Sequence, residues 1–211
     1  MPPGVSPKSE LRAHIRSARR ALAGPDRQTF DDALTSSVLD LVLRTGARSV
    51  AAYRPTAFEP GGTVLVPALA AAVPRLLLPV LRADHDLDWA RFDGTFATGR
   101  RGLVEPAGPR LGRQAVATVD LVLVPALAAT PDGARLGQGG GSYDRVLPRA
   151  TAPAIVLLYP GELLDSLPSE PHDQRVCGTL IGYESAHVHW TKGCAIPHHW
   201  HSKYQSANDG G

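Results

Sequence analysis

The chain has 211 residues, 43% of them hydrophobic, and a formal net charge of +2 at pH 7. This length fits one domain with a substantial core, and so small a charge gives no ground for nucleic-acid binding. Two cysteines give no disulfide framework and fit a reducing compartment, so we expect a cytoplasmic protein. The N-terminus has no apolar signal core, and prolines and an arginine interrupt the most apolar window, 64–81, which excludes a membrane-spanning helix there.

The first helix is predicted to begin at Ser6, where a serine cap precedes a proline in the first turn. Lys8 and Arg12 lie four positions apart and therefore share a face of this helix. Three further arginines make the helix strongly basic, and we interpret them as a solvated face: Arg16, Arg19 and Arg20. RNA binding is the weaker alternative, because no aromatic residues interleave with these charges.

Strand-like and helix-like segments alternate along the rest of the chain. Helices are predicted over 26–44, with Gly46 as the stop, over 64–73 and over 143–147. Strands are predicted over 49–53, 75–81, 87–92, 119–124 and 154–159. This alternation predicts a single three-layer α/β/α domain with a mostly parallel or mixed sheet. The acidic run Asp84–Asp88 lacks the glycine and the glutamate of a calcium loop, so we interpret it as a hairpin turn.

A glycine-rich loop follows the apolar run Asp120–Pro125 and precedes the short helix. A strand, a glycine loop and a helix in succession are typical of an anion site, because glycines let backbone N–H groups approach an oxyanion and the helix N-terminus carries about half a positive charge. Arg135 and Arg145 flank the loop and could clamp phosphate oxygens. The loop is neither a Walker motif nor a clean dinucleotide fingerprint.

Asp144 lies in the first turn of the short helix, beside the expected phosphates. Two anions in contact repel each other unless a cation lies between them, so a carboxylate here points to Mg²⁺, which takes one or two carboxylates together with phosphate oxygens. The alternative is that Asp144 only caps the helix dipole while the glycines form a tight turn.

Five elements of the chain, in sequence order, are similar to motifs of one enzyme family. They are Lys8-Ser-Glu-Leu-Arg12, Tyr53 to Glu59, Gly102-Leu-Val-Glu-Pro106, Arg135-Leu-Gly-Gln-Gly-Gly-Gly-Ser-Tyr-Asp-Arg145 and Leu167-Pro-Ser-Glu-Pro-His-Asp173. Through them the chain resembles 5-formyltetrahydrofolate cyclo-ligase, also called methenyltetrahydrofolate synthetase. Each element alone is a weak signal, whereas their joint order is specific.

The resemblance implies a reaction in which ATP and 5-formyltetrahydrofolate give 5,10-methenyltetrahydrofolate, ADP and phosphate. It implies that Lys8, Arg12 and Arg135 hold the ATP phosphates, and that Asp144 and Asp173 bind Mg²⁺. Glu59 would hydrogen-bond the pterin part of the folate. Asp144, Arg135 and Arg145 would carry the catalytic charges. The loop backbone would line the junction of nucleotide and folate: Leu136, Gly137, Gln138, Gly139, Gly140, Gly141, Ser142 and Tyr143, with Gln138 to Ser142 also facing the folate.

Some positions depart from the family pattern. Ser142 stands where a second tyrosine is usual, and Cys177-Gly-Thr replaces a segment that contains an aspartate. These departures keep an alternative open, a non-catalytic nucleotide-binding or regulatory paralogue on the same fold. We expect a monomer whose partner is the small-molecule substrate, with neither nucleic acid nor membrane.

The C-terminal segment contains five histidines, one cysteine and two tryptophans without a helix or strand period. We therefore predict a cyclo-ligase-like domain over residues 1–183 and a disordered or weakly docked tail over 184–211.

Overall fold

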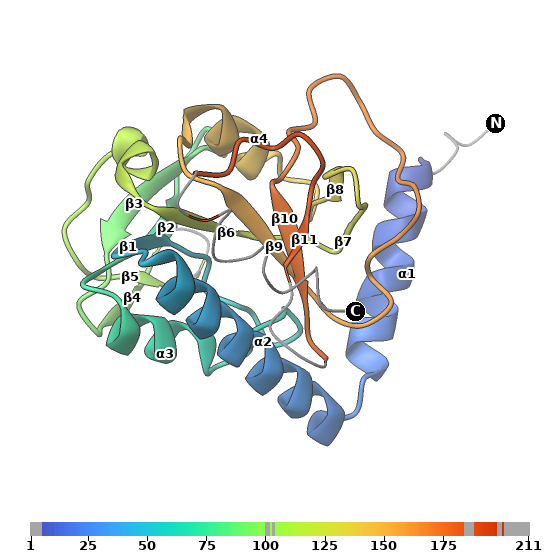
Figure 1. Ribbon diagram of the computed structural model, residues 1–211, viewed down its shortest axis with the longest axis horizontal. Helices are drawn as coiled ribbons and strands as arrows, with labels where there is room; N and C mark the ends of the chain where they lie inside the picture. The colour runs from blue at the N-terminus through green and yellow to red at the C-terminus, as the bar shows by residue number, and fades with distance from the viewer. Residues whose placement is uncertain (1–5, 100–101, 103, 184–187, 198–199, 201–211) are drawn as a thin grey trace.

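The structure, a computed structural model, describes residues 6–99, 102, 104–183, 188–197 and 200. A seven-stranded sheet forms its middle layer, in the strand order β11-β10-β9-β6-β1-β2-β3 (Figure 1). The helices are α1 (Pro7–Ala21), α2 (Gly24–Thr45), α3 (Leu65–Ala72) and α4 (Ser142–Val146), with 3₁₀ turns η2 (Arg113–Thr118) and η3 (Leu147–Arg149). The sheet strands are β1 (Ser49–Ala51), β2 (Arg75–Leu81), β3 (Leu87–Arg91), β6 (Leu121–Pro125), β9 (Ala154–Leu158), β10 (Gly178–Ile181) and β11 (His189–Trp190).

The centre of the sheet is parallel and both of its edges are antiparallel. Strands β10, β9, β6, β1 and β2 pair in parallel, whereas β3 and β11 each pair antiparallel to their neighbour. Continuous apolar runs such as β6 and β9 suit a parallel sheet that is buried on both faces. The predicted three-layer domain with a mixed sheet is confirmed.

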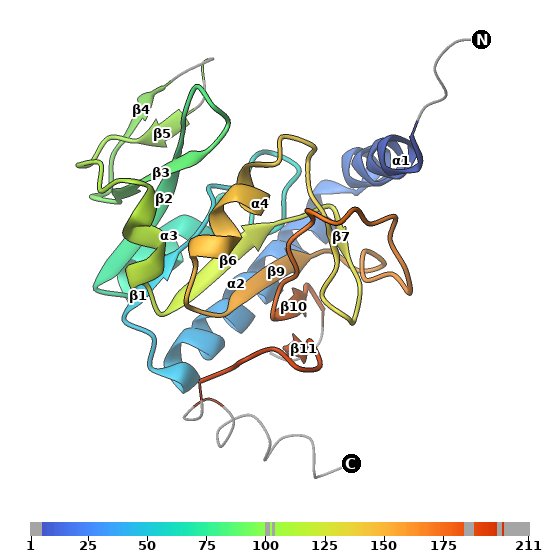
Figure 2. The same cartoon turned by 90° about the horizontal axis from the view of Figure 1, so that it is seen from above.

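The two faces of the sheet bury alternate side chains of the same strands. Leu121 and Leu123 pack in the core cluster under α2 and α3, while Val122 and Val124 pack in a second cluster with η2 and α4. Figure 1 shows α2 and α3 in front of the sheet. Figure 2 shows α4 between α1 and the hairpin of β4 (Phe96–Thr98) and β5 (Val104–Pro106). The period of two along each strand thus supplies both cores.

Several local predictions are confirmed. Ser6 caps α1, its side chain accepting from the Ser9 amide at 3.3 Å, and Gly46 caps α2 in the left-handed conformation. The acidic run Asp84–Asp88 lies at the turn between the antiparallel strands β2 and β3, as the hairpin interpretation required.

The sequence suggested that the chain passes directly from β6 into the glycine loop, and this prediction is wrong. A small hairpin of β7 (Ala128–Ala129) and β8 (Arg135–Leu136) comes between them. The turn at Pro131–Gly133 reverses the chain, so the glycine loop continues from β8 and not from a core strand. A second hairpin, β4 (Phe96–Thr98) with β5 (Val104–Pro106), was not predicted either.

The interpretation of the basic first helix needs a correction. Arg19 is only 3% exposed, and its guanidinium forms two hydrogen bonds of 2.7 Å with the Glu162 carboxylate and a third with the Ala126 carbonyl. Arg16 binds the Gln138 side chain, which leaves Arg20 as the solvated member of the three. Two of the three arginines therefore dock the helix on the domain.

The C-terminal segment is not a separate tail in its described part. β11 pairs antiparallel with β10, and Val188 and Trp200 are 3% and 2% exposed in the main core cluster. A disulfide joins Cys177 to Cys194, against the expectation of two free thiols. Sequence period could not reveal a two-residue strand and isolated apolar anchors. Residues 184–187, 198–199 and 201–211 of the predicted tail lie outside the described part.

Among the described residues, no helix combines the length and the apolar character that crossing a membrane requires.

Candidate active site

The candidate site lies beyond the carboxyl ends of two neighbouring parallel strands, β1 and β6. The chain leaves β1 towards β2 on one side and leaves β6 towards β9 on the other, so the strand order reverses between them. Open α/β sheets form a crevice at such a reversal, because consecutive connections diverge there. The loop after β1 carries Glu59, and the chain after β6 leads through β7 and β8 to the glycine loop.

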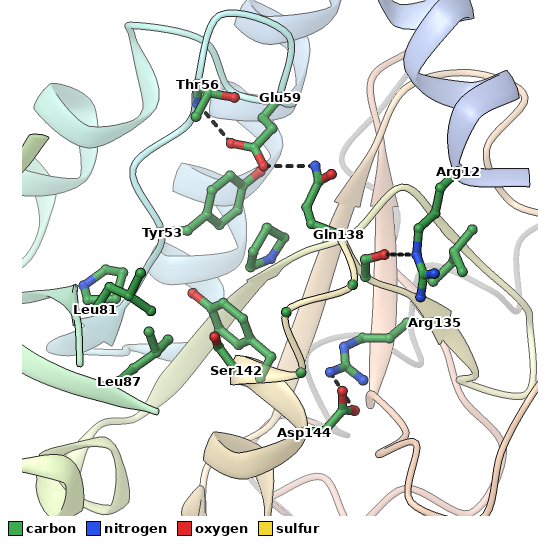
Figure 3. A pocket seen from close by; sticks show the side chains of 18 of the residues that line it. Arg12, Tyr53, Thr56, Glu59, Leu81, Leu87, Arg135, Gln138, Ser142 and Asp144 are labelled. Carbon is green, nitrogen blue, oxygen red and sulfur yellow. Dashed lines mark hydrogen bonds and ion pairs between the residues drawn. The ribbon is translucent and has the colours of Figure 1, made fainter. Parts of the chain in front are cut away.

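A cavity of about 430 Å³ opens at this place (Figure 3). One wall is apolar and comes from β2, β3 and β5, with Leu81, Leu87 and Val104 among its side chains. The opposite wall is polar and comes from α1, the glycine loop and the segment before β10. Most of the residues expected to bind ligands line the cavity: Lys8, Arg12, Glu59, Arg135, Leu136, Gly137, Gln138, Gly139, Gly140, Gly141, Ser142, Tyr143, Asp144 and Asp173.

Helix α1 holds the glycine loop through its arginines. The Arg12 Nε donates to the Gly137 carbonyl at 2.9 Å, and the Arg16 Nη2 donates to the Gln138 carbonyl at 2.8 Å. Gly139 has a φ of 104°, a conformation that favours glycine. A β-carbon there would lie 3.6 Å from the Arg12 guanidinium carbon, so the loop passes close beneath this cation.

Asp144 and Arg135 form an ion pair at the floor of the cavity. The Arg135 Nη2 donates to Asp144 Oδ1 at 2.8 Å, and the Gln174 amide donates to the same oxygen at 3.2 Å. Among the described residues, nothing donates to Asp144 Oδ2, so one oxygen of this carboxylate is available for a ligand. Arg135 is 8% exposed and also donates to the Gln174 carbonyl at 2.7 Å, which fixes its orientation.

Lys8 and Asp173 form the second charged pair of the polar wall. The Lys8 Nζ lies 2.8 Å from Asp173 Oδ2 and 2.9 Å from Glu170 Oε2. Partial burial opposes both charges, but these hydrogen bonds outweigh it, so the pKa of Lys8 is raised and the pKa of Asp173 is lowered. One ligand atom each from Glu170, His172 and Asp173 lie within 4.8 Å of one another, a set that could also hold a metal ion.

Glu59 faces the cavity from the loop after β1 (Figure 3). Its Oε2 accepts from the Thr56 amide at 2.8 Å, and its Oε1 accepts from the Gln138 side-chain amide at 3.2 Å. Because Gln138 belongs to the glycine loop and is also bound by Arg16, a chain of hydrogen bonds connects α1 to Glu59.

Two expectations for the glycine loop do not fit the geometry. Arg145 does not line the cavity; it is exposed, and its Nη1 donates to the Gly140 carbonyl at 3.3 Å. α4 has only five residues, so the dipole of a longer helix is not available to the loop. Side-chain cations, more than the helix, therefore give this wall its positive charge.

Sequence reasoning missed several lining residues. Arg54 and Glu105 line the cavity, the first beside the ring of Phe96 and the second buried, with its Oε1 accepting from the Leu81 amide at 3.1 Å. Both residues stand in recognised elements, Arg54 in Tyr53 to Glu59 and Glu105 in Gly102 to Pro106, and these elements could have marked them.

Tyr143 supplies a polar group that has no partner within the described part of the chain. Its hydroxyl is buried and makes no hydrogen bond there, although the residue lines the cavity. Burial raises the pKa of this phenol, and the nearby charge of Glu59 raises it further. A buried hydroxyl without a partner is costly, so a bound ligand that accepts or donates here would gain from it.

Comparison with known sequences decides the family. The sequence profile of the 5-formyltetrahydrofolate cyclo-ligase family matches residues 5–181. The chain belongs to this family of enzymes. A 5-formyltetrahydrofolate cyclo-ligase from Mycolicibacterium smegmatis is 39% identical over 174 residues, which cover 79% of this chain and 89% of the relative. The enzyme of the same name from Haemophilus influenzae is 27% identical over 185 residues, covering 83% and 97%.

Solved structures agree with this family assignment. The chain resembles the 5,10-methenyltetrahydrofolate synthetase of Aquifex aeolicus with a TM-score of 0.74 and 27% identity, over 91% of this chain and 97% of the other. The synthetase of Mycoplasma pneumoniae gives a TM-score of 0.66 at 21% identity, over 84% and 98%, which supports the fold alone. The resemblance seen in the five sequence elements is therefore confirmed.

Proposed function

We propose that this protein converts 5-formyltetrahydrofolate to 5,10-methenyltetrahydrofolate in a reaction driven by ATP and Mg²⁺. One observation carries the proposal: residues scattered from one end of the domain to the other, Lys8, Arg12, Glu59, Asp144 and Asp173, line a single cavity. Their chemistry matches a substrate pair in which one member is polyanionic and the other carries a flat heterocycle.

The two walls of the cavity suit the two substrates. Leu81, Leu87 and Val104 offer an apolar surface to a pterin ring, and the Glu59 carboxylate offers acceptors to paired N–H donors on its edge. Lys8 and Arg12 on the opposite wall offer cations to phosphates, and the glycine loop between the walls has no side chain to keep the substrates apart at Gly139 to Gly141.

The chemical problem is that a formyl oxygen is a poor leaving group. Bound Mg-ATP supplies a phosphoryl group that converts this oxygen into phosphate, which departs when the second folate nitrogen attacks the formyl carbon. The protein positions the two substrates and neutralises charge, which is most of what phosphoryl transfer requires. Arg135 and Lys8 oppose the negative charge that builds on the transferred group.

Asp144 and Asp173 fit the proposed Mg²⁺. The ion prefers carboxylate oxygens and phosphate, and each of these aspartates keeps one oxygen that accepts no hydrogen bond from the described residues. The Lys8 ammonium bridges Asp173 and Glu170, and an acidic corner that attracts one cation supports a site for another.

An assay of product formation tests the proposal. Purified protein mixed with Mg-ATP and 5-formyltetrahydrofolate should give the absorbance rise of methenyltetrahydrofolate, and omission of ATP or addition of a chelator should abolish it. If folded protein binds ATP but forms no product, the non-catalytic paralogue is correct. Ser142, a small residue on the cavity wall where the family pattern has a tyrosine, is the feature that favours this second candidate.

The monomeric state, the absence of nucleic-acid partners and the cytoplasmic location stay predictions. The Cys177–Cys194 disulfide makes the location testable, because a reducing compartment keeps such pairs as thiols. If the protein is cytoplasmic, thiol trapping in a cell extract should find both cysteines free, in contrast to the pair in the structure. A fully oxidised pair would contradict the cytoplasmic location.

A further inference from the structure

The loop that carries Glu59 has little regular structure of its own. It connects β1 to α3, and two of its residues, Gly61 and Gly62, have φ values of 97° and 48°. Its own backbone hydrogen bonds at this point are local turns, from the Glu59 amide to the Thr56 carbonyl at 3.1 Å and from the Gly62 amide to the Glu59 carbonyl at 3.3 Å. Turns of this kind shape the loop but do not tie it to the rest of the domain, so side chains from other elements must do so.

Two consecutive peptide groups of this loop, 59–60 and 60–61, are held by side chains from the core. The Tyr53 hydroxyl donates to the Pro60 carbonyl at 2.6 Å, and the Gly61 amide donates to Asp31 Oδ1 at 2.8 Å. The Tyr159 hydroxyl lies 2.8 Å from the same Asp31 oxygen and 3.3 Å from the Glu59 carbonyl. Asp31 is thus the acceptor on which the amide of Gly61 and the hydroxyl of Tyr159 converge.

Asp31 lies beneath the loop and outside the cavity. The residue is 5% exposed on α2, and it does not line the cavity. A β-carbon at Gly62 would lie 2.4 Å from Asp31 Oδ2, so the loop packs directly against the carboxylate. Burial of a carboxylate is costly unless hydrogen bonds compensate it. Within the described part of the chain, the hydrogen bonds to the Asp31 side chain come from the Gly61 amide and the Tyr159 hydroxyl.

We propose that Asp31 is a positioning residue for the folate side of the site: it fixes the backbone at Glu59 to Gly61 so that the Glu59 carboxylate faces the bound heterocycle. The proposal rests on the proposed function, in which Glu59 binds the pterin. The anchored loop contains Glu59, whereas the cations proposed to bind phosphate lie on other elements. Loss of Asp31 should therefore weaken the binding of folate and leave the binding of ATP unchanged.

Kinetics of Asp31 variants test this assignment. Asp31→Ala removes the oxygen that accepts from both the Gly61 amide and the Tyr159 hydroxyl. The KM for 5-formyltetrahydrofolate should rise about tenfold or more, since a displacement of Glu59 on the order of 1 Å is costly in a binding site. The KM for ATP should change less than about twofold. Asp31→Asn keeps an oxygen at the Oδ1 position and should restore most of the folate affinity. Asp32→Asn, one residue further along α2 and exposed, is the matched control and should behave like the parent.

A double-mutant cycle separates positioning from general destabilisation. In a Glu59→Gln background, Asp31→Ala should add little to the folate KM, because the group through which it acts is already altered. Equal effects on both substrates, or additivity with Glu59→Gln, would overturn the proposal. If Asp31→Ala fails to fold, Tyr53→Phe and Tyr159→Phe must show the same selective loss, because each removes a single hydroxyl from the same set of anchors.

Hydrogen exchange keeps this test distinct from that of the proposed function. Exchange in the segment 57–63 should rise in Asp31→Ala, while exchange in the glycine loop 137–141 should not. If the parent forms no product, or if Glu59→Gln leaves the folate KM unchanged, the proposed function fails, and with it the assignment to folate. If Glu59→Gln raises the folate KM while Asp31→Ala alters neither that KM nor the exchange, Asp31 does not position Glu59.

Discussion

Two clusters of aspartates and basic residues differ in whether their carboxylates have an oxygen that accepts no hydrogen bond. In the turn cluster (Asp84, Asp86, Arg113 and Arg149), the Asp86 Oδ1 accepts from Arg149 at 2.7 Å and the Oδ2 accepts from Arg113 at 3.2 Å. In the cavity cluster (Lys8, Arg135, Asp144 and Asp173), each aspartate keeps one oxygen without a donor among the described residues. In the first cluster the charged groups are paired with one another, whereas in the second some carboxylate oxygens at the cavity wall remain available to a ligand.

This difference separates stability from binding. Asp86 is 3% exposed and far from the glycine loop in sequence, and its partners join the β2–β3 turn to η2 and η3. We infer that the turn cluster stabilises the fold and that the cavity cluster binds ligands, a contrast that substitution can test.

The largest expected effect is on turnover in Asp144→Asn. This change keeps the size of the side chain and removes the charge that Mg²⁺ requires, so turnover should fall on the order of a hundredfold or more. The melting temperature should fall as well, because the buried Arg135 loses its counter-charge and keeps its bond to the Gln174 carbonyl, so turnover is compared per folded molecule. Steady-state assays at saturating Mg²⁺ measure the effect, and turnover equal to that of the parent would reduce Asp144 to a helix cap.

The next effect is on stability in Asp86→Asn. Loss of this buried charge leaves Arg149 without a counter-charge and leaves Arg113 with Asp84 alone, so it should cost about 3 kcal/mol in the free energy of unfolding. For a chain of this size that corresponds to a fall of about 10 °C in melting temperature. Turnover per folded molecule should stay near that of the parent. A large loss of turnover without loss of stability would break the contrast between the clusters.

Acid should remove the same contribution from the parent. Burial opposes the charge of Asp86, but hydrogen bonds from Arg149 and the Leu87 amide outweigh it and hold its pKa below the ordinary 3.8. A lowered pKa in the folded state gives stability that is present above the unfolded value and is lost as pH falls through the folded value. The difference in unfolding free energy between parent and Asp86→Asn should therefore be constant from neutral pH to about pH 5 and shrink below 3.8. Urea unfolding over this pH range measures it, and a difference that does not change with pH would contradict the assignment.

A smaller effect should separate the two substrates within the cavity. Lys8→Ala and Arg12→Ala should raise the KM for ATP about tenfold and that for folate much less, while Glu59→Gln should do the reverse. Arg20→Ala, an exposed arginine on the same helix as Lys8 and Arg12, is the control for loss of charge alone. Equal effects of Lys8→Ala, Arg12→Ala and Glu59→Gln on the KM values of both substrates would indicate damage to the fold.

The smallest effect is expected for Arg145→Ala. The side chain is exposed and does not line the cavity, so turnover should stay within about threefold of the parent, the range of a modest surface effect. Arg135→Ala, which removes the partner of Asp144, should be far more damaging. A comparable loss of turnover in both variants would support the phosphate contact that the sequence suggested for Arg145.

Local sequence determined much of the framework of this protein. The Ser6 cap, the Gly46 stop and the apolar runs of β6 and β9 each act through near neighbours or through a short period, so the alternation of elements and the mixed sheet could be predicted. The motifs around Lys8, Glu59, Asp144 and Asp173 also named most of the residues that line the cavity, because a resemblance carries residues over one by one.

Only the tertiary structure decided which charges are buried, which are paired and which face the cavity. Arg19 and Arg16 stand one turn apart in the same basic helix, yet the first is buried against Glu162 and the second holds Gln138. Trp200 and β11 join the core without any periodic signal, and Asp31 reaches Gly61 across 30 positions of sequence. Such contacts depend on segments that meet only when the sheet is assembled, and no local pattern in the chain specifies them.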